Sequence, residues 1–190
     1  LVGDPNTSGI SCVITNENIH EMLDLAGYEE VNTVYSGSFP SQMTSGLNEG
    51  VSLFNYRGYY GVSGFGSSDV NSTSNGFMLP VATVITCGTG SFASNNEALS
   101  ESFLRAGTSS NPKGSVVCIG TATLGTHTMF NNIVDMGFYY GALLKGLDTP
   151  GAALMYGKMM LYTNYPSNPN NYCHIFTHWN NLMGESSLQM

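Results

Sequence analysis

Short apolar segments rich in β-branched residues alternate along the chain with segments of helical periodicity. Three apolar runs predict buried strands, at residues 50–56 (GVSLFNY), 80–86 (PVATVIT) and 115–120 (SVVCIG). Residues 1–3 have the composition of a strand end, and residues 30–35 and 172–177 predict two further strands.

Five segments between these runs predict helices, at residues 18–26, 41–47, 97–106, 130–145 and 152–162. In the first, Asn18 and Glu21 form a capping-box-like start and Gly27 ends the helix. The Ser-, Asn- and Pro-rich segments 66–77 and 165–171 are predicted as surface loops. The alternation of strands and helices predicts an α/β fold: a three-layer α/β/α sandwich with a mainly parallel sheet.

Composition narrows the class of protein. The 190 residues suffice for one domain with its own core, and the net charge is −8, from 5 Lys+Arg against 13 Asp+Glu. This balance argues against nucleic acid and against anionic lipid surfaces, which both need a basic face. No apolar run is long enough to span a membrane. The low charge, offset by neutral polar residues, favours an extracellular protein.

Chemistry in a parallel sheet gathers beyond the carboxyl ends of the strands. Asp4 follows the first strand, Cys87 and Gly88 follow the strand at 80–86, and His127 lies in the loop after the strand at 115–120. Cys87 is either a small core residue or a thiolate nucleophile. His127 is either a loop histidine bonded to backbone or the base for Cys87.

The remaining cysteines and histidines carry weaker signals. Cys118 lies in mid-strand and is expected to pack in the core, and His20 is expected on the solvent side of a helix. His174 and His178 have a spacing that would bind a metal on a helix. Because their segment is predicted as strand and loop, we expect no metal site there. No cysteine or histidine cluster has the spacing of a zinc site.

Several segments, in order along the chain, carry a family resemblance. They are GVSLFNYRGYYG, LPVATVITCGTGSF, ESFLRAG, KGSVVCIGTAT and WNNLMGESSL. The first is similar to a strand ending in N-Y-x-G-H-G, the second to a strand ending in a nucleophilic cysteine, and the last to W-x-x-x-G-D-P-S-L. The chain thereby resembles the gingipain-like cysteine peptidases, peptidase family C25, whose catalytic subdomain has a caspase-like fold.

The resemblance implies roles for individual residues. Cys87 falls on the nucleophile, and Asp4 falls on the acidic partner of the catalytic histidine. That histidine falls on Tyr59, and a phenol with a pKa near 10 is a poor base at neutral pH. Two hypotheses follow. Either His127 substitutes as the base of an active peptidase, or the domain is an inactive scaffold or binding surface.

Backbone amides of the oxyanion site would come from Gly88 and from the turn Gly58, Tyr59, Tyr60 and Gly61. Tyr60 occupies the second glycine position of the motif unless Gly61 takes it after a one-residue shift. These tyrosines either line a pocket or pack.

Specificity and context also follow from the resemblance. Arg-specific members carry an acidic residue just before the first helix, whereas this stretch reads Cys12-Val13-Ile14-Thr15, so a neutral or apolar P1 residue is expected. Residues 1–190 are expected to form a single catalytic subdomain of a secreted or cell-surface protein, without the flanking subdomain and C-terminal domains. The expected partners are a peptide substrate or, in the inactive case, a surface partner or further copies. No cofactor is required, and structural calcium is compatible with the Asp/Asn-rich loops.

Overall fold

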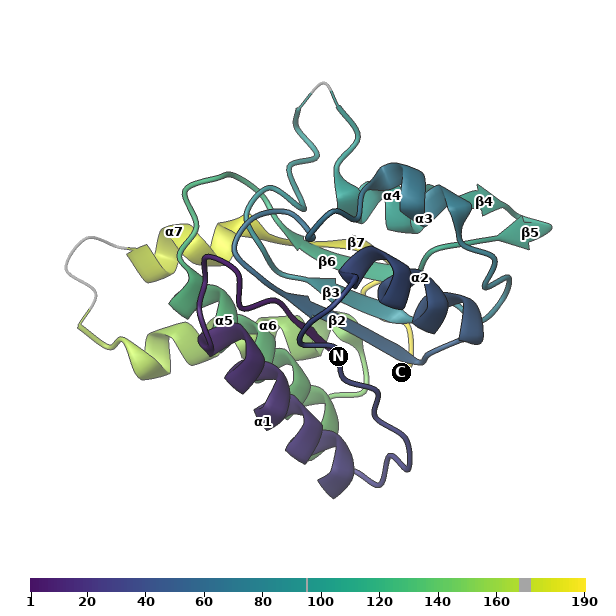
Figure 1. Ribbon diagram of the computed structural model, residues 1–190. Helices are drawn as coiled ribbons and strands as arrows, with labels where there is room; N and C mark the ends of the chain where they lie inside the picture. The colour runs from purple at the N-terminus through teal and green to yellow at the C-terminus, as the bar shows by residue number, and fades with distance from the viewer. Residues whose placement is uncertain (95, 168–171) are drawn as a thin grey trace.

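The computed structural model describes residues 1–94, 96–167 and 172–190. Its centre is a five-stranded sheet in the order β1-β2-β3-β6-β7 (Figure 1). The first four strands are parallel and β7 runs antiparallel to β6. The bounds are β1 (Val2–Gly3), β2 (Leu53–Arg57), β3 (Val81–Val84), β6 (Val117–Thr121) and β7 (Asn180–Gly184).

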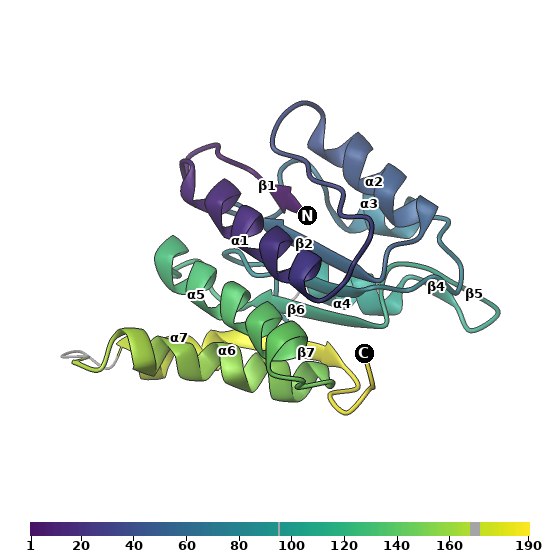
Figure 2. The same cartoon turned by 90° about the horizontal axis from the view of Figure 1, so that it is seen from below.

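Helices cover both faces of this sheet, which makes the predicted three-layer sandwich (Figures 1 and 2). One face carries α2 (Phe39–Glu49), α3 (Ser67–Ser72) and α4 (Leu99–Arg105). The other carries α1 (Ser11–Leu25), α5 (Thr128–Tyr139), α6 (Pro150–Asn164) and α7 (Tyr172–Trp179). A π-helical turn, η1 (Tyr140–Leu144), extends α5, and a small hairpin of β4 (Gly107–Thr108) and β5 (Asn111–Pro112) follows α4.

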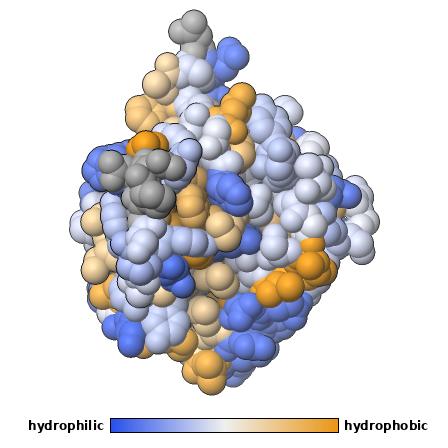
Figure 3. Space-filling model, turned by 90° about the vertical axis from the view of Figure 1, so that its left-hand side faces the viewer, coloured by the Kyte–Doolittle hydropathy of each residue, from blue (hydrophilic) through white to orange (hydrophobic). Residues whose placement is uncertain are grey.

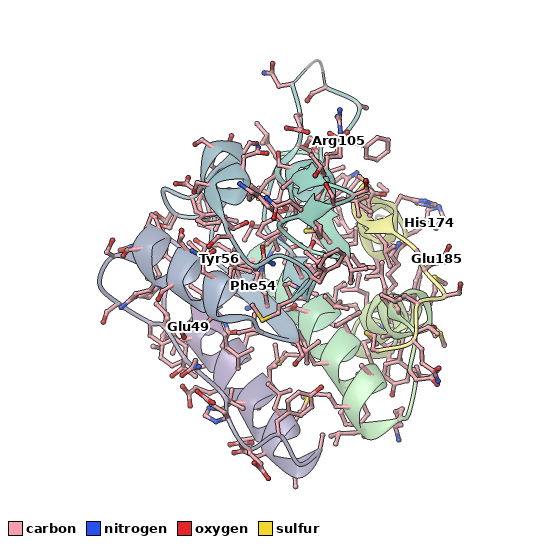
Figure 4. The ribbon with its side chains drawn as sticks, turned by 90° about the vertical axis from the view of Figure 1, so that its right-hand side faces the viewer. Glu49, Phe54, Tyr56, Arg105, His174 and Glu185 are labelled. Atoms are coloured by element: carbon pink, nitrogen blue, oxygen red, sulfur yellow. The ribbon has the colours of Figure 1, made fainter. Side chains whose placement is uncertain are left out.

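Alternating side chains of the central strands feed two separate cores. Phe54 and Tyr56 of β2 lie in the core under α2, α3 and α4 (Figure 4), whereas Ile119 of β6 lies in the core under α5, α6 and α7. The period of two along each strand explains this division, because neighbouring residues point to opposite faces.

The first helix begins earlier than predicted. α1 starts at Ser11, so Asn18 lies inside the helix and its side-chain amide donates to the carbonyl of Ile14. The predicted capping box at Asn18 and Glu21 is therefore wrong. The stretch 12–15 likewise lies within α1 rather than before it. It therefore does not correspond to the position before the first helix at which Arg-specific members of the family carry an acidic residue.

The two predicted outer strands are also wrong. Residues 30–35 contribute only a bridge between Val34 and Val2, because β1 is two residues long and offers no further partners. Residues 172–177 belong to α7, whose buried residues Cys173 and Phe176 are three apart, a helical period.

The final strand is β7, which begins at Asn180, three residues after the end of the segment predicted as a strand. Of the predicted loops, 66–77 contains the short helix α3, and residues 168–171 of the second loop lie outside the described residues. None of the described helices is long and apolar enough to cross a membrane.

Candidate active site

The carboxyl ends of β2, β3 and β6 bring three predicted segments together. Tyr60 pairs with Cys87 through a parallel bridge, and the Gly61 amide donates to the Cys87 carbonyl at 3.1 Å. The Gly88 amide donates to the Thr123 carbonyl at 2.8 Å. Cys87 therefore lies between the turn that follows β2 and the loop that follows β6.

The Cys87 side chain is 9% exposed, and its sulfur contacts a hydroxyl. The distance from Cys87 Sγ to Thr126 Oγ1 is 2.6 Å. The Asn131 side-chain amide donates to the same Thr126 oxygen at 3.1 Å, which leaves the Thr126 proton free to point at the sulfur. A hydroxyl donor in this position stabilises a thiolate more than a thiol.

His127 faces away from this contact. It is the N-cap of α5, and its Nδ1 accepts a hydrogen bond from the Met129 amide at 3.2 Å. Its ring lies against Phe130, with ring centroids 5.5 Å apart. Its backbone is extended, so the Thr126 and His127 side chains point to opposite sides. The loop reaches Cys87 as predicted, but with Thr126 rather than with the imidazole.

Asp4 is buried and is held by neighbours other than a histidine. Its Oδ1 accepts from the Asn6 amide at 2.9 Å and its Oδ2 accepts from the Tyr56 hydroxyl at 3.3 Å. Burial, with a smaller contribution from the Asp4 carboxylate, raises the pKa of Tyr56 to about 12, so the phenol keeps its proton and donates it. In this arrangement Asp4 fixes the end of β1 against β2.

The predicted oxyanion amides are partly occupied. The Gly61 and Gly88 amides already donate to carbonyls, as described above. Gly88 has φ +80, and a Cβ there would lie 3.2 Å from Leu124 Cδ2. The turn at Gly58 is close-packed as well, since a Cβ there would lie 2.5 Å from the Tyr56 hydroxyl. These glycines shape the turns around Cys87.

Exposed side chains lie on the two segments that neighbour Cys87 and Gly88. Tyr59, Tyr60 and Leu124 are 52%, 63% and 66% exposed. We call these three residues the apolar rim. The view onto the left-hand side of the molecule shows hydrophobic side chains in separate groups among hydrophilic ones (Figure 3). The tyrosines are therefore not core residues, and their surface is open to a ligand.

A buried arginine connects the segments that form the site. The Arg57 guanidinium is fully buried and donates to the carbonyls of Ile85 and Thr128 and to Asn132 Oδ1. Ile85 lies two residues before Cys87, and Thr128 lies two residues after Thr126. Arg57 thus ties together the two segments that carry the sulfur and its hydroxyl partner.

The charge of Arg57 is balanced by Asp135 of α5, with Nε and Oδ2 3.9 Å apart. Asp135 Oδ2 also accepts from the Asn55 amide at 2.9 Å. Burial raises the pKa of Asp135 to about 7, although Arg57 and Asn55 act in the opposite direction.

The other cysteines have structural environments. All four cysteines are free and buried. Burial raises the pKa of Cys118, in agreement with its predicted place in the core. The Cys12 thiol donates to the Gly58 carbonyl at 3.6 Å, and the Cys173 thiol donates to the Leu161 carbonyl at 3.8 Å.

Sequence reasoning missed Thr126, Asn131 and the Arg57–Asp135 pair. Arg57 stands at the variable position of N-Y-x-G, so the motif does not indicate a role for the residue at this position. Thr126 and Asn131 are common polar residues, and only the fold brings them to the sulfur.

A mainly parallel sheet sandwiched by helices, with a cysteine beyond the end of a central strand, is the architecture of a caspase-like cysteine peptidase. The model of peptidase family C25 matches residues 8–190, and the chain belongs to this family.

Relatives agree with this assignment. The chain is 30% identical over 126 residues to gingipain R2 of Porphyromonas gingivalis W83, which is 63% of this chain and 17% of that protein. It is 29% identical over 126 residues to gingipain R1 of Porphyromonas gingivalis, 13% of whose length is covered. The chain thus spans less than a fifth of these curated relatives.

Solved structures support the fold. The crystal structure of the Arg-specific cysteine proteinase gingipain R (RGPB) matches with a TM-score of 0.86 and 22% identity, over 100% of this chain and 46% of that one. The complex of Porphyromonas gingivalis RgpB pro- and mature domains matches with a TM-score of 0.85. The predicted caspase-like fold is therefore confirmed.

Proposed function

We propose that this chain is a peptidase domain that hydrolyses peptide bonds through the Cys87 thiolate and does not select Arg or Lys at P1. The position of Cys87 carries the proposal: it follows β3 of a C25 fold, beside the exposed apolar rim. Peptides and proteins are the corresponding substrates.

In the proposed reaction, the Cys87 sulfur attacks the scissile carbonyl carbon and forms a tetrahedral intermediate. Its collapse breaks the C–N bond and leaves a thioester, while the amine departs with the proton that the thiol has lost. Water then attacks the thioester, which regenerates the thiol and releases the carboxylic acid. Thr126 holds the thiolate by its hydroxyl.

His127 is the proposed carrier of the proton between the thiol and the leaving amine. To act, it must leave its N-cap position on α5, which costs about 1 kcal/mol of helix stability. Asp4 is the proposed acidic residue of the site. The amides for the oxyanion would become free in a second backbone arrangement of Gly88 and of the turn at Gly58, Tyr59, Tyr60 and Gly61.

The neutral specificity rests on the rim and on Asp4. Tyr59, Tyr60 and Leu124 carry no charge, and Asp4 is 4% exposed and its carboxylate already accepts two hydrogen bonds. A basic P1 side chain would therefore find no free carboxylate among these residues.

A second candidate function is an inactive domain that binds a surface partner or further copies of itself. It is favoured by the environment of Cys87. The Cys87 sulfur forms a hydrogen bond with the Thr126 hydroxyl, whereas the His127 ring accepts a hydrogen bond from the Met129 backbone amide. Loss of general-base assistance lowers rates about 10²–10⁴-fold.

The decisive experiment is labelling by an electrophilic peptide with an apolar P1 residue, followed by cleavage of a peptide library. An active site predicts labelling at Cys87, its loss in Cys87→Ala, and cleavage that falls at least about 10²-fold in His127→Ala. Labelling without library cleavage supports the inactive domain. A preference for Arg at P1 would contradict the proposed specificity.

We further propose an extracellular or cell-surface location, supported by the sparse charge and the neutral polar composition. Detection of the protein in the medium or on the surface of its source cells tests this. Hydrolysis as proposed needs no cofactor, because the nucleophile and the proton carrier are side chains. Structural calcium is a separate proposal, and a lower melting temperature after chelation by EGTA would support it.

A further inference from the structure

Two histidines on α7 form a pair outside the candidate active site. His174 and His178 are four residues apart on one face of the helix, with 3.4 Å between their Nε2 atoms. Both side chains are exposed, and Figure 4 shows His174 on the outer side of α7. The helical conformation of α7 brings the two side chains together, whereas in the predicted strand residues four apart would lie far from each other.

The separation of the two nitrogens fits a metal chelate. Zinc–imidazole bonds are about 2.0–2.1 Å long, so two nitrogens on a tetrahedral ion lie about 3.3–3.4 Å apart. The observed 3.4 Å matches this spacing. The same distance is longer than the roughly 2.7–3.2 Å typical of N–H···O hydrogen bonds.

The surroundings hold this geometry in place. Cys173 and Phe176 of the same helix are buried in the core, so the opposite face with the two histidines is fixed toward solvent. The rings stand at 83° to each other with centroids 4.7 Å apart. The net charge of −8 favours the approach of a cation.

We propose that His174 and His178 bind one borderline divalent ion, of the class of Zn²⁺, Co²⁺ or Ni²⁺, through both Nε2 atoms. Imidazole nitrogen is a preferred ligand of this class, whereas Ca²⁺ and Mg²⁺ prefer oxygen. Within the described ranges, no set of three or more His, Cys, Asp or Glu side chains is placed to hold a metal. Water therefore completes the coordination, and the ion remains open to further ligands.

The ion would join two successive turns of α7. The end of this helix is connected to the candidate active site, because the Trp179 carbonyl accepts from the Ala122 amide at 2.7 Å and Thr123 accepts from Gly88. His178 also lines a hollow with Ser91, Thr123 and Asn181. Metal binding would thus stabilise the surface beside the loop that carries Thr126.

Titration of the whole chain with Co²⁺ alone, followed by calorimetry with Zn²⁺ alone, tests the proposal. We expect one ion per chain, a Co²⁺ absorption spectrum with nitrogen ligation, and an affinity that falls more than about tenfold in His174→Ala or His178→Ala. At 100 times Kd, Zn²⁺ should raise the melting temperature by about 5–10 °C. Mg²⁺ should do neither.

Two control variants separate this site from others. His20→Ala removes a histidine on another helix, and Cys87→Ser removes the thiol that competes for Zn²⁺; binding should persist in both. Unchanged binding in His174→Ala and His178→Ala, loss of binding in Cys87→Ser, or one ion for two chains would each overturn the proposal. These results are independent of whether Cys87 cleaves peptides.

Discussion

At the scale of single residues, the candidate site combines a predictable nucleophile with unpredicted neighbours. Cys87 could be found because a cysteine followed by glycine at a strand end is a recognisable pattern. Thr126 could not be found, because it and His127 are adjacent in the sequence and only the extended backbone decides which side chain faces the sulfur.

Replacing Tyr59 by histidine tests whether the missing base limits activity. Tyr59 is more than half exposed, so the fold should accept the change. If the site lacks a working base, Tyr59→His should raise peptide cleavage by about 10²-fold or more, because imidazole titrates near neutral pH. Tyr60→His is the matched control on the next exposed position. Equal rates in the wild type and Tyr59→His would show that the position alone does not restore the base.

The Thr126 hydroxyl should control the reactivity of Cys87. Thr126→Val keeps the shape but removes the hydroxyl 2.6 Å from the sulfur, so the thiolate loses a hydrogen-bond partner and Cys87 should react more slowly. The rate of alkylation by iodoacetamide at a fixed pH measures this change. Thr126→Ser keeps the hydroxyl and should keep the wild-type rate. An unchanged rate in Thr126→Val would mean that the hydroxyl does not hold the thiolate.

At the scale of elements, the central strands were predictable and the periphery was not. The strands β2, β3 and β6 are buried on both sides, and their sequences are therefore largely apolar. Residues 172–177 have an equally apolar composition, yet form α7, because a six-residue run does not distinguish a period of two from one of three to four.

The crossing of α5 and α6 depends on two glycines. A Cβ at Gly157 would lie 2.4 Å from the Val134 carbonyl oxygen, and one at Gly137 would lie 2.7 Å from the Gly157 Cα. Gly157→Ala should therefore push the helices apart and cost about 1–3 kcal/mol in the free energy of unfolding. Gly46→Ala in α2 is the control, since a Cβ there meets nothing within 4 Å and should be neutral or stabilising. Urea denaturation of both variants measures the difference. An equal loss of unfolding free energy in both variants would show that the cost comes from placing alanine in a helix and not from the close contact between α5 and α6.

At the scale of the whole molecule, charged residues are few, and one pair of opposite charges is buried. The sequence alone could not pair Arg57 with Asp135, because the two residues are 78 positions apart and meet only when β2 and α5 pack together. This pair lies beneath the site and links it to global stability, because Arg57 donates to the segments that carry Cys87 and Thr126 and also contacts Asp135 of α5.

Asp135 should make the stability of the whole fold depend on pH. Its pKa is about 7 in the folded chain, against an ordinary value of 3.8, so the folded state holds the proton more tightly. The stabilisation is fully present below about pH 4 and is lost as the pH rises through about 7, a change of about 3 kcal/mol between pH 5 and 8.

Asp135→Asn mimics the protonated carboxyl at every pH and should remove this contribution to the slope. Melting temperatures from pH 5 to 8 measure it: the wild type should lose about 5–10 °C relative to the variant across this range. Comparing the two proteins cancels the other titrating groups. Parallel curves would mean that Asp135 stays ionised beside Arg57, and that the attraction between the two charges outweighs the cost of burying them.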